Sequence, residues 1–326
     1  GRVVRPPGYS GRLVSLDAAE VQAMPGVVAV VRDGSFIGVI AAREEEAIRA
    51  QRRLARIAQW TEQPLLPQST DPRYLLACPA SEEIVNEKNA ETIVSDTILE
   101  AEYSRPHIAH ASIGPSCAVA QFADGRYTVW THSQGIFPLR GDLAKALAVD
   151  ENSITVIHAE GAGCYGHNGA DDVALDAALL ARALPGRPVR VQWMREDEFA
   201  WEPYGSAMVV RMRAELDSAG SIANWSHEVW SHGHSTRPGG KGGVNLLAGW
   251  HLAQPVSPAT PGNPPLPAGG SHRNAAPLYD FPRQRIVNRL VREAPLRVSA
   301  LRSLGAHVNV FAIESFMDEL AFAVGA

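Results

Sequence analysis

The sequence predicts a mixed α/β fold in two regions, a small α+β region over residues 1–85 and a larger region over residues 86–326. Two short β-branched runs and an amphipathic helix come first, and strand-like segments dominate from about residue 96. Between residues 154 and 193, a strand, a glycine-rich loop, a helix and a second strand follow one another. That order is typical of a βαβ-like unit, and it is the clearest fold signal in the chain.

The first region begins with a hairpin. Residues 27–31 and 36–41 are β-branched runs on either side of Asp33-Gly34, a dipeptide that favours a tight turn. Residues 44–58 place apolar side chains three and four positions apart, which predicts an amphipathic helix. The prolines at positions 64 and 67 and the polar stretch after them predict a loop that leads out of this region.

The second region is predicted to be rich in strands. They are expected over 96–104, 116–122, 127–134, 154–160, 188–193, 209–216 and 222–230, with turns at Asp124-Gly125 and over 217–220. Helices are expected from Pro138 to Leu147 and from Asp171 to Leu184. The Pro- and Gly-rich segment 236–277 is too broken for regular structure, and ordered loops of that length commonly serve a binding site or a subunit contact.

The composition of the chain indicates which kinds of molecule it is expected to bind. The chain has 326 residues, 45% of them hydrophobic, and a net charge of -5, so it has no basic footprint for nucleic acid. Its three cysteines, Cys78, Cys117 and Cys164, are widely spaced and predict neither a disulfide framework nor a cysteine-held iron–sulfur site. A small organic substrate or a protein partner is therefore expected.

The sequence does not indicate the cellular compartment of the protein. No stretch is long and apolar enough for a membrane helix, and no signal peptide opens the sequence. Residues 1–11 read as mid-protein sequence and residues 316–326 read as the end of a helix, so both ends are expected to be cut. The compartment, cytoplasmic or periplasmic, stays open.

The loop after residue 160 contains Gly161-Ala162-Gly163-Cys164-Tyr165-Gly166, which spells the dinucleotide fingerprint G-x-G-x-x-G. Glycines before a helix let main-chain N–H groups point at an anion or a polar oxygen. A dinucleotide fold also needs an aliphatic strand and an acid about twenty residues further on. Here the strand carries His158 and Glu160, and residues 180–190 contain no acid. NAD(P) or FAD binding and a ligand-free tight turn both remain as alternatives for this loop.

Two further segments change the interpretation. Upstream lies Trp130-Thr131-His132-Ser133-Gln134-Gly135, and downstream lies the stretch from Pro295 to Ala306 with Leu301-Arg302-Ser303-Leu304-Gly305 inside it. Together with the glycine loop, these segments resemble the molybdenum-cofactor-binding large subunit of the xanthine dehydrogenase/aldehyde oxidase family. The nicotinate dehydrogenase and isoquinoline 1-oxidoreductase subgroup is the most similar. The resemblance implies an α/β hammerhead domain over 1–85 followed by the first molybdopterin-binding domain over 86–326.

The resemblance also implies site residues. Gln134 matches the glutamine beside the molybdenum centre. Gly163, Cys164, Tyr165 and Gly166 match a Gly-Gly-Phe-Gly turn whose main-chain amide faces an oxo ligand. Arg302, with Ser303 and Gly305, matches the segment that contacts the pterin. The chemistry of these groups agrees, because an N–H and a neutral amide can hydrogen-bond a metal-oxo oxygen and an arginine fork suits phosphate. No side chain is expected to ligate the metal directly, since the pterin dithiolene holds it.

In such enzymes the cofactor, here expected in its cytosine dinucleotide form, hydroxylates an electron-poor carbon of an N-heterocycle or an aldehyde carbon with oxygen from water. Electrons then leave through [2Fe–2S] clusters, which the scarcity of cysteine here places on a separate subunit, and pass to a flavoprotein or cytochrome. Tyr165 is expected either to wall the catalytic pocket or to pack with its hydroxyl in water.

Several positions depart from the family pattern. Tyr165 replaces a phenylalanine, Cys164 a glycine, and Gly114 an acidic residue, while His307-Val308-Asn309 lacks a glutamine common there. These departures fit the nicotinate-type subgroup better than xanthine dehydrogenase itself. The family's general-base glutamate lies in a C-terminal domain, and no glutamate of this chain is assigned to that role. A non-catalytic scaffold subunit and a nicotinamide-dependent dehydrogenase therefore remain alternatives.

Other conspicuous residues have simpler interpretations. His227, His232 and His234 could suggest a zinc site, but polar packing explains them with fewer assumptions. His107 and His110 are expected to form hydrogen bonds or the rim of a pocket. Residues 195–198, an Arg-Glu-Asp-Glu run, are expected to form a solvated turn. Cys164 could be a reactive thiol, but a small residue packed under the cofactor is the preferred interpretation.

Overall fold

The computed structural model describes residues 1–62, 70–89, 95, 97–240 and 242–325, which pack into two compact units. The first unit comprises Gly1–Leu66, His110–Glu202 and Arg237–Thr260. The second comprises Pro67–Ala109, Pro203–Thr236 and Pro261–Ala326. Packing therefore interleaves segments that are distant in sequence, and the division into domains at residue 85 stays a prediction.

The N-terminal part of the first unit contains the predicted hairpin and helix. Strands β3 (Val27–Asp33) and β4 (Phe36–Ala41) pair antiparallel, and β1 (Arg2–Val4) adds to β4 to give the order β1-β4-β3. Helix α2 (Glu44–Ile57) packs on β1 and β4 beside the short α1 (Ala19–Gln22), while β2 (Leu13–Ser15) pairs with β5 (Gln59–Trp60). The apolar stripe of α2 closes this core through Ala47, Ala50 and Leu54, as its spacing predicts. The predicted loop lies largely at positions 63–69, outside the described residues.

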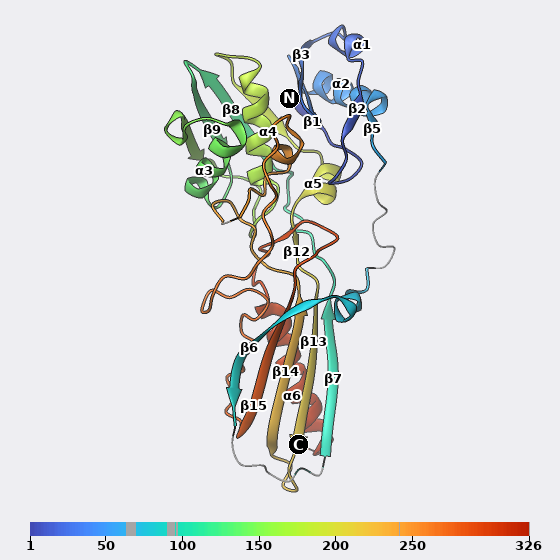
Figure 1. Cartoon of the computed structure of the whole chain (residues 1–326), viewed down its shortest axis with the longest axis vertical. Coiled ribbons are helices and arrows are strands. Elements are labelled where there is room, and N and C mark those ends of the chain that lie inside the picture. The colour runs from blue at the N-terminus through green and yellow to red at the C-terminus, as the bar shows by residue number, and fades with distance from the viewer. Residues whose placement is uncertain (63–69, 90–94, 96, 241, 326) are drawn as a thin grey trace. The chain divides into compact units, whose positions relative to one another are not determined.

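A four-stranded sheet carries the rest of the first unit (Figure 1). Its order is β10 (Ile154–His158), β9 (Arg126–Thr131), β8 (Cys117–Ala123) and β11 (Val189–Gln192). The β8–β9 hairpin turns at Asp124 and Gly125, whose φ angles of 50° and 73° suit the tight turn that Asp-Gly predicts. Helix α3 (Ile136–Leu147) packs on β10, the strand that follows the short η2 (Glu151–Ser153), and α4 (Ala170–Arg182) packs on β8, β9 and β11.

Helix α4 is enclosed by protein. Every residue from Ala170 to Ala181 is buried, and its alanines and leucines pack with β8, β9 and β11 into one apolar core. The helix therefore gives its N-terminal end, and the glycine loop before it, a rigid base.

The sheet order argues against a dinucleotide fold. Strand β10 is parallel to β9, whereas β8 is antiparallel to β9 and β11 is antiparallel to β8. Strands β10 and β11 therefore lie at opposite edges of a mixed sheet. A doubly wound sheet instead binds its dinucleotide where adjacent parallel strands diverge. The structure does not have the arrangement that the G-x-G-x-x-G alternative requires.

The expectation of a solvated turn at 195–198 is wrong. Residues Arg195–Trp201 form helix α5, and Glu198 is 0% exposed. Its carboxylate accepts hydrogen bonds of 2.9 Å from both the main-chain N–H and the hydroxyl of Ser116. The partner, Ser116, lies 82 positions away in sequence, so the run of charged residues could not show that one of its four side chains points inward.

The second unit is built on a five-stranded sheet, β6 (Ala80–Lys88), β15 (Arg283–Val291), β14 (Ile222–Ser231), β13 (Met208–Leu216) and β7 (Thr97–Arg105). Helix α6 (Ala306–Ala323) lies across one face of the sheet (Figure 1). Met212, Trp225 and Phe316 are central to the apolar core between them. The remaining short elements are η1 (Pro72–Ala77), β12 (Tyr204–Gly205) and β16 (Val298–Ser299), the last two paired in parallel.

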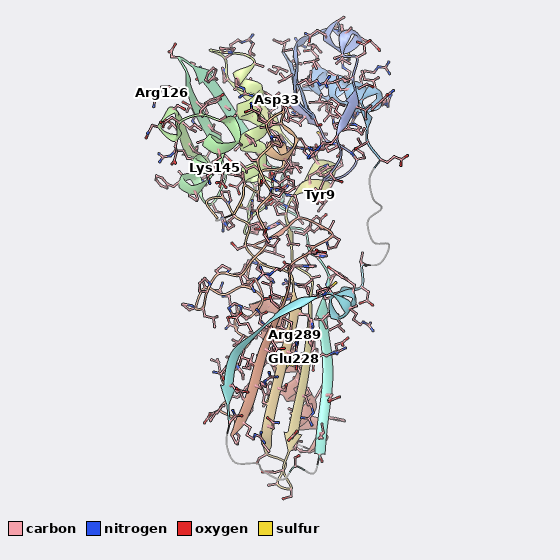
Figure 2. All side chains as sticks on the ribbon, viewed as in Figure 1. Tyr9, Asp33, Arg126, Lys145, Glu228 and Arg289 are labelled. Carbon is pink, nitrogen blue, oxygen red and sulfur yellow. The ribbon has the colours of Figure 1, made fainter. Side chains whose placement is uncertain are left out.

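The opposite face of this sheet is charged. Arg289, labelled with Glu228 in Figure 2, lies 3.1 Å from Glu228 and 2.6 Å from Glu82. Its guanidinium also lies 5.1 Å from the centre of the Trp230 ring, and Arg211 lies 5.5 Å from the same ring. Side chains that alternate between core and charge explain why one face of β14 is buried.

The segment 236–277 has little regular structure, as predicted. Its one helical stretch among the described residues is the 3-10 turn η3 (Leu247–His251). Leu246, Leu247 and Trp250 are nevertheless buried, so this segment helps to form the core of the first unit. In the parts of the chain that the structure describes, no helix is long and apolar enough to cross a membrane.

Candidate functional site

Gln134 lies in the turn between β9 and α3. Strand β9 ends at Thr131, three residues earlier than predicted. The Thr131 hydroxyl ends the strand, because it donates to the Ala170 carbonyl at 2.9 Å and accepts a hydrogen bond from the Ser133 N–H at 3.3 Å. The Gly135 N–H donates to the Ser133 hydroxyl at 3.1 Å. Thr131 and Ser133 are buried while the Gln134 side chain is exposed. Two buried hydroxyls thus hold the main chain on both sides of an accessible amide.

The loop 161–169 joins β10 to α4 in backbone conformations that few L-residues adopt. Gly163 has a φ of 108°, Tyr165 of 58° and Gly166 of 130°. A Cβ on Gly163 would lie 2.7 Å from Cζ of Tyr165, so the absence of a side chain lets the tyrosine ring fold back over the loop. Tyr165 itself is 41% exposed, which leaves both of its expected roles open.

The structure brings the loop and the Gln134 turn together. A Cβ on Gly161 would lie 2.6 Å from Cβ of His132, so only glycine permits this approach. Burial raises the pKa of the Cys164 thiol, and the main-chain N–H groups of Asn168 and Gln134 oppose that rise by hydrogen bonding to the sulfur. Gln134, Gly163, Cys164, Tyr165 and Gly166 therefore belong to one local site in the first unit.

Cys164 is packed inside this site. Its side chain is 7% exposed, and the sulfur lies 3.1 Å from the Gly166 carbonyl and 3.2 Å from Oδ1 of Asn168. A thiol whose pKa is raised by burial is a poor nucleophile. These contacts suit the packing role that was preferred for Cys164.

Asn168 is a site residue that the sequence interpretation missed. It is fully buried; its Oδ1 accepts the N–H of Ala170, the first residue of α4, at 3.0 Å. Its Nδ2 donates to the Ser112 hydroxyl at 2.9 Å and to the Gly163 carbonyl at 3.2 Å. An asparagine side chain that accepts the N–H two residues further on forms an Asx turn, a recognised turn signal, so the position could have been found.

Three carboxylates on α4 face internal partners. Asp171 accepts a hydrogen bond of 2.5 Å from Ser133, Asp172 one of 2.6 Å from the Leu247 N–H, and Asp176 one of 2.8 Å from the Trp193 indole. Arg5 also pairs with Asp176. Burial raises the pKa of Asp171 to about 7, and the hydrogen bond from Ser133 opposes the rise. Nε2 of His167 lies 3.4 Å from the second oxygen of this carboxylate.

The histidines beside the turn are held neutral or bonded. Burial, aided by neighbouring His158, lowers the pKa of His132. Nδ1 of His158 lies 3.1 Å from the Ser133 carbonyl, so this nitrogen carries the proton and donates it. Burial therefore disfavours a positive charge on the His132 ring.

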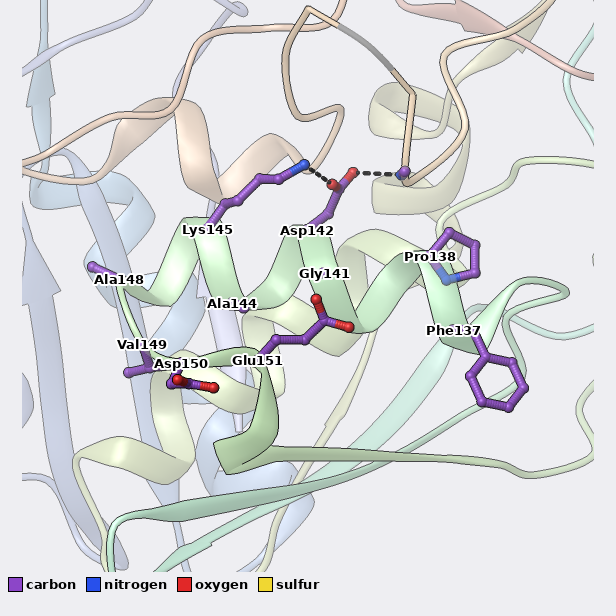
Figure 3. A pocket seen from close by; sticks show the side chains of 11 residues that line it. Phe137, Pro138, Gly141, Asp142, Ala144, Lys145, Ala148, Val149, Asp150 and Glu151 are labelled. Atoms are coloured by element: carbon purple, nitrogen blue, oxygen red, sulfur yellow. Dashed lines mark hydrogen bonds and ion pairs between the residues drawn. The ribbon is translucent and has the colours of Figure 1, made fainter.

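Arg237 places a positive charge next to Gln134, and the sequence interpretation missed this residue as well. It lies at the start of the irregular segment, is half-buried, and its Nη2 donates to Oε1 of Gln134 at 3.3 Å. Two residues on, the Gly239 N–H donates to Asp142 of α3 at 3.1 Å. Figure 3 shows a dashed line between Asp142 and Lys145 on α3. Both residues line a pocket of about 690 Å³, to which Gly239 also contributes. No periodicity marks Arg237, because it lies outside any helix or strand.

Arg302, Ser303 and Gly305 lie in the second unit, immediately before α6. Arg302 and Ser303 are exposed, and Ser303 and Leu304 both have positive φ angles, 73° and 54°. Gly305 is buried, and a Cβ there would lie 2.3 Å from the Ser271 carbonyl oxygen. Two consecutive left-handed residues are uncommon and cluster at functional sites.

Four histidines of the second unit form hydrogen bonds within it: His107, His227, His232 and His234. Nε2 of His227 lies 3.2 Å from Oδ1 of Asn309, and Nε2 of His234 lies 3.0 Å from the Ser231 hydroxyl. The Tyr74 hydroxyl lies between two histidines, 3.0 Å from Nε2 of His107 and 2.6 Å from Nε2 of His232. In the first unit, the main-chain N–H of His110 donates to Glu202 at 2.7 Å, and Nδ1 of the His110 ring lies 3.5 Å from the other oxygen of that carboxylate. Polar packing therefore accounts for these rings. Among the described residues, no three His, Cys, Asp or Glu side chains are grouped as metal ligands would be.

Comparison with known proteins identifies the family of the chain. Residues 81–254, more than half of the chain, match the family described as "Molybdopterin cofactor-binding domain". This stretch includes Gln134, the loop 161–169 and Arg237, whereas Arg302 lies beyond it.

Two relatives and one solved structure extend the match. The chain is 38% identical over 340 residues to a subunit of the nicotinate dehydrogenase of Pseudomonas putida, covering 100% of this chain and 27% of the relative. It is 28% identical over 217 residues to a subunit of the isoquinoline 1-oxidoreductase of Brevundimonas diminuta, covering 66% of this chain and 25% of the relative. The structure of quinoline 2-oxidoreductase from Pseudomonas putida 86 superposes with a TM-score of 0.71 at 20% identity, over 99% of this chain and 45% of that one. The chain thus spans about a quarter of each of these two relatives, and the resemblance seen in the sequence is confirmed.

Proposed function

The chain belongs to the molybdopterin cofactor-binding domain family, and from this membership we propose that it is part of the large subunit of a molybdenum hydroxylase. In this proposal the Gln134 turn and the loop 161–169 bind the molybdenum–molybdopterin cofactor. The observation that carries it is the junction of these two segments, where Gly161 allows contact with His132 and the Gln134 N–H is near enough to the Cys164 sulfur to lower the pKa of its thiol, against the larger effect of burial.

The residues present fit such a group. A pterin bearing a metal-oxo unit and phosphates offers many oxygen acceptors, and the site offers an exposed amide, a guanidinium and a glycine loop at the start of α4. The carboxylates that could repel an anion are directed elsewhere, since Asp171, Asp172 and Asp176 each bond an internal donor. The site therefore places outward donors over carboxylates that each bond an internal donor.

When bound, the cofactor supplies the two-electron oxidation and oxygen-transfer chemistry. The chain's own residues bind and orient it. Gln134 donates its amide N–H as a neutral group, which stabilises negative charge on an oxygen without changing the total charge of the site. Cys164 packs beneath the loop and holds it against the Gln134 turn, and the exposed ring of Tyr165 forms part of the wall around the substrate.

Arg302, Ser303 and Gly305 are proposed to bind the organic part of the cofactor. The guanidinium of Arg302 is suited to phosphate or to the polar edge of a pterin. Ser303 adopts a positive φ, and Gly305 packs its backbone against Ser271, which together fix the direction in which the Arg302 segment enters α6.

The substrate class and partners follow from the same proposal. The substrate is an N-heterocycle, oxidised at an electron-poor ring carbon, or an aldehyde. The cofactor is the cytosine dinucleotide form. We further propose that the [2Fe–2S] clusters that accept the electrons belong to a separate subunit, and that this subunit passes the electrons to a flavoprotein or cytochrome.

Cofactor analysis of the purified full-length gene product tests the proposal. We expect molybdenum in amounts approaching one per chain, cytosine monophosphate after acid hydrolysis, and oxidation of N-heterocycles or aldehydes with an artificial electron acceptor. Bound NAD or FAD without molybdenum would instead support a nicotinamide- or flavin-dependent dehydrogenase. Protein that binds neither metal nor nucleotide in its complete assembly would identify a scaffold subunit.

A further inference from the structure

The main chain around Gln134 is fixed on both sides of the residue. The Ser133 N–H donates to the Thr131 hydroxyl at 3.3 Å, and the Gly135 N–H donates to the Ser133 hydroxyl at 3.1 Å. These contacts set where the side chain starts. They do not set which end of its terminal amide points in which direction.

That choice matters chemically. A glutamine amide has an oxygen that only accepts and a nitrogen that only donates. Rotation by half a turn exchanges the two ends, so an amide held only at its backbone can present either one. Stabilising an oxygen acceptor requires that the nitrogen end face it.

Arg237 supplies the missing constraint. Its Nη2 donates to Oε1 of Gln134 at 3.3 Å. A guanidinium only donates, so it can bond the oxygen end of the amide and not the nitrogen end. Oε1 of Gln134 therefore accepts a hydrogen bond from Arg237, and the two N–H groups of Nε2 point away from Arg237.

Arg237 is itself anchored on the helix that follows Gln134. The Gly239 N–H donates to Asp142 of α3 at 3.1 Å, an interaction drawn in Figure 3, and Asp142 is 1% exposed. A Cβ on Gly239 would lie 2.6 Å from Cβ of Pro138, also in α3, so this backbone lies directly on the helix. The backbone two residues after the arginine is therefore held on α3.

We propose that Arg237 is the positioning residue that orients the Gln134 amide, so that Nε2 faces the oxygen acceptor of the bound cofactor. The inference rests on the proposed function. A donor bonded at its oxygen to a cation is also a stronger donor at its nitrogen, because hydrogen bonds in a chain polarise one another. The positive charge of Arg237 further favours an anionic cofactor at this position.

The test uses the full-length protein in its native assembly and a small set of variants. Arg237→Met removes the donor, and Arg237→Lys keeps the charge with a single donor group. Arg140→Met is the matched control, since Arg140 is on α3 and pairs across the surface with Glu151 at 2.7 Å. Gln134→Ala, alone and combined with Arg237→Met, completes a double-mutant cycle.

We expect Arg237→Met to lower kcat by about tenfold, with molybdenum content and KM much less affected, because a charged hydrogen bond is lost. The Mo(V) electron paramagnetic resonance signal of the partly reduced protein should shift in this variant and in Gln134→Ala. Arg237→Lys should recover to within about threefold of the unmodified protein, and Arg140→Met should match it in both readouts. In the Gln134→Ala background, Arg237→Met should change kcat by less than about twofold.

Two results would overturn the inference alone. One is a molybdenum-containing, active protein in which Arg237→Met and Arg237→Lys leave both kcat and the resonance signal unchanged. The other is a loss of the same size with and without Gln134, which would mean that Arg237 acts independently of the amide. Unmodified protein without molybdenum would reject the proposed function and this inference with it.

Discussion

The hydroxyl of Ser133 donates a hydrogen bond of 2.5 Å to the carboxylate of Asp171, and it accepts the N–H of Gly135 at 3.1 Å. One buried side chain of α4 thus holds the turn that presents Gln134. Because α4 is buried along most of its length and packed in the core, the turn bonded to it is held in place.

This relationship predicts a pH dependence of stability. Burial raises the pKa of Asp171 from 3.8 to about 7 in the folded protein. Between these values the folded state keeps a proton that the unfolded state has released, so the contribution of Asp171 to stability is lost progressively as pH rises from about 4 to 7. Asp171→Asn cannot ionise, and its side-chain oxygen can still accept the Ser133 hydroxyl.

Urea unfolding of the two proteins between pH 4.5 and 7.5 measures the effect. The free energy of unfolding of the unmodified protein, minus that of Asp171→Asn, should decrease as pH rises. A difference that stays constant or increases would show that Asp171 ionises normally in the folded protein.

Gly163→Ala should damage the site more than the fold. At a φ of 108° an alanine is strained, and its Cβ would lie 2.7 Å from the Tyr165 ring, which must move. Gly125→Ala is the matched control, because it has a φ of 73° in a turn with open space around it. Both variants should lose about 1 kcal/mol of stability, whereas only Gly163→Ala should lower molybdenum content, measured by mass spectrometry of the purified protein. Equal molybdenum contents in the two variants would contradict the proposed role of the loop.

Cys164 should be unreactive in the folded protein. Burial raises the pKa of its thiol, so little thiolate is present at neutral pH. Iodoacetamide followed by peptide mass spectrometry should label Cys164 slowly under native conditions and rapidly in urea. Labelling at the same rate in both conditions would show that the thiol is accessible and that the packing role is wrong.

Truncating Cys164 should loosen the site. Cys164→Ala removes the sulfur contacts with the Gly166 carbonyl and with Asn168, so it should destabilise the fold by about 1–3 kcal/mol. Cys164→Ser keeps a hydroxyl able to form both bonds and should lose less. The order is checked by urea unfolding, and a serine variant less stable than the alanine variant would argue that volume, not hydrogen bonding, matters at this position.

Arg302→Met should weaken cofactor retention without affecting folding, because the side chain is exposed. Arg292→Met, also exposed in the second unit, is the control. We expect the cytosine monophosphate released by acid to fall several-fold, by roughly the loss of one or two charge-assisted hydrogen bonds, only in Arg302→Met. If both variants retain the nucleotide fully, Arg302 does not contact the cofactor.

Local patterns were sufficient to predict the hairpin of β3 and β4, the helices α2 and α4, and the antiparallel pair β13 and β14. Each depends on contacts between residues close in sequence, or on one apolar stripe. Strands β6 and β15 were missed. Both carry charges along one face and lie about 200 positions apart, so their pairing is specified only by the assembled sheet.

The site shows the same limit. Gln134 and the glycine loop were found through motifs, and the structure places them together. Arg237, Asn168 and Asp171 act through partners distant in sequence or through single hydrogen bonds, which leave no periodic trace. Glu198 was misread for that reason, since its burial depends on Ser116 and not on its charged neighbours.

The most direct test of the central claim is anomalous scattering at the molybdenum absorption edge from crystals of the complete protein. The account predicts a single strong peak beside the Gln134 amide and the loop 161–169, with Arg237 still bonded to the amide oxygen. A molybdenum peak remote from both segments, or crystals of active enzyme with no molybdenum signal at all, would contradict it.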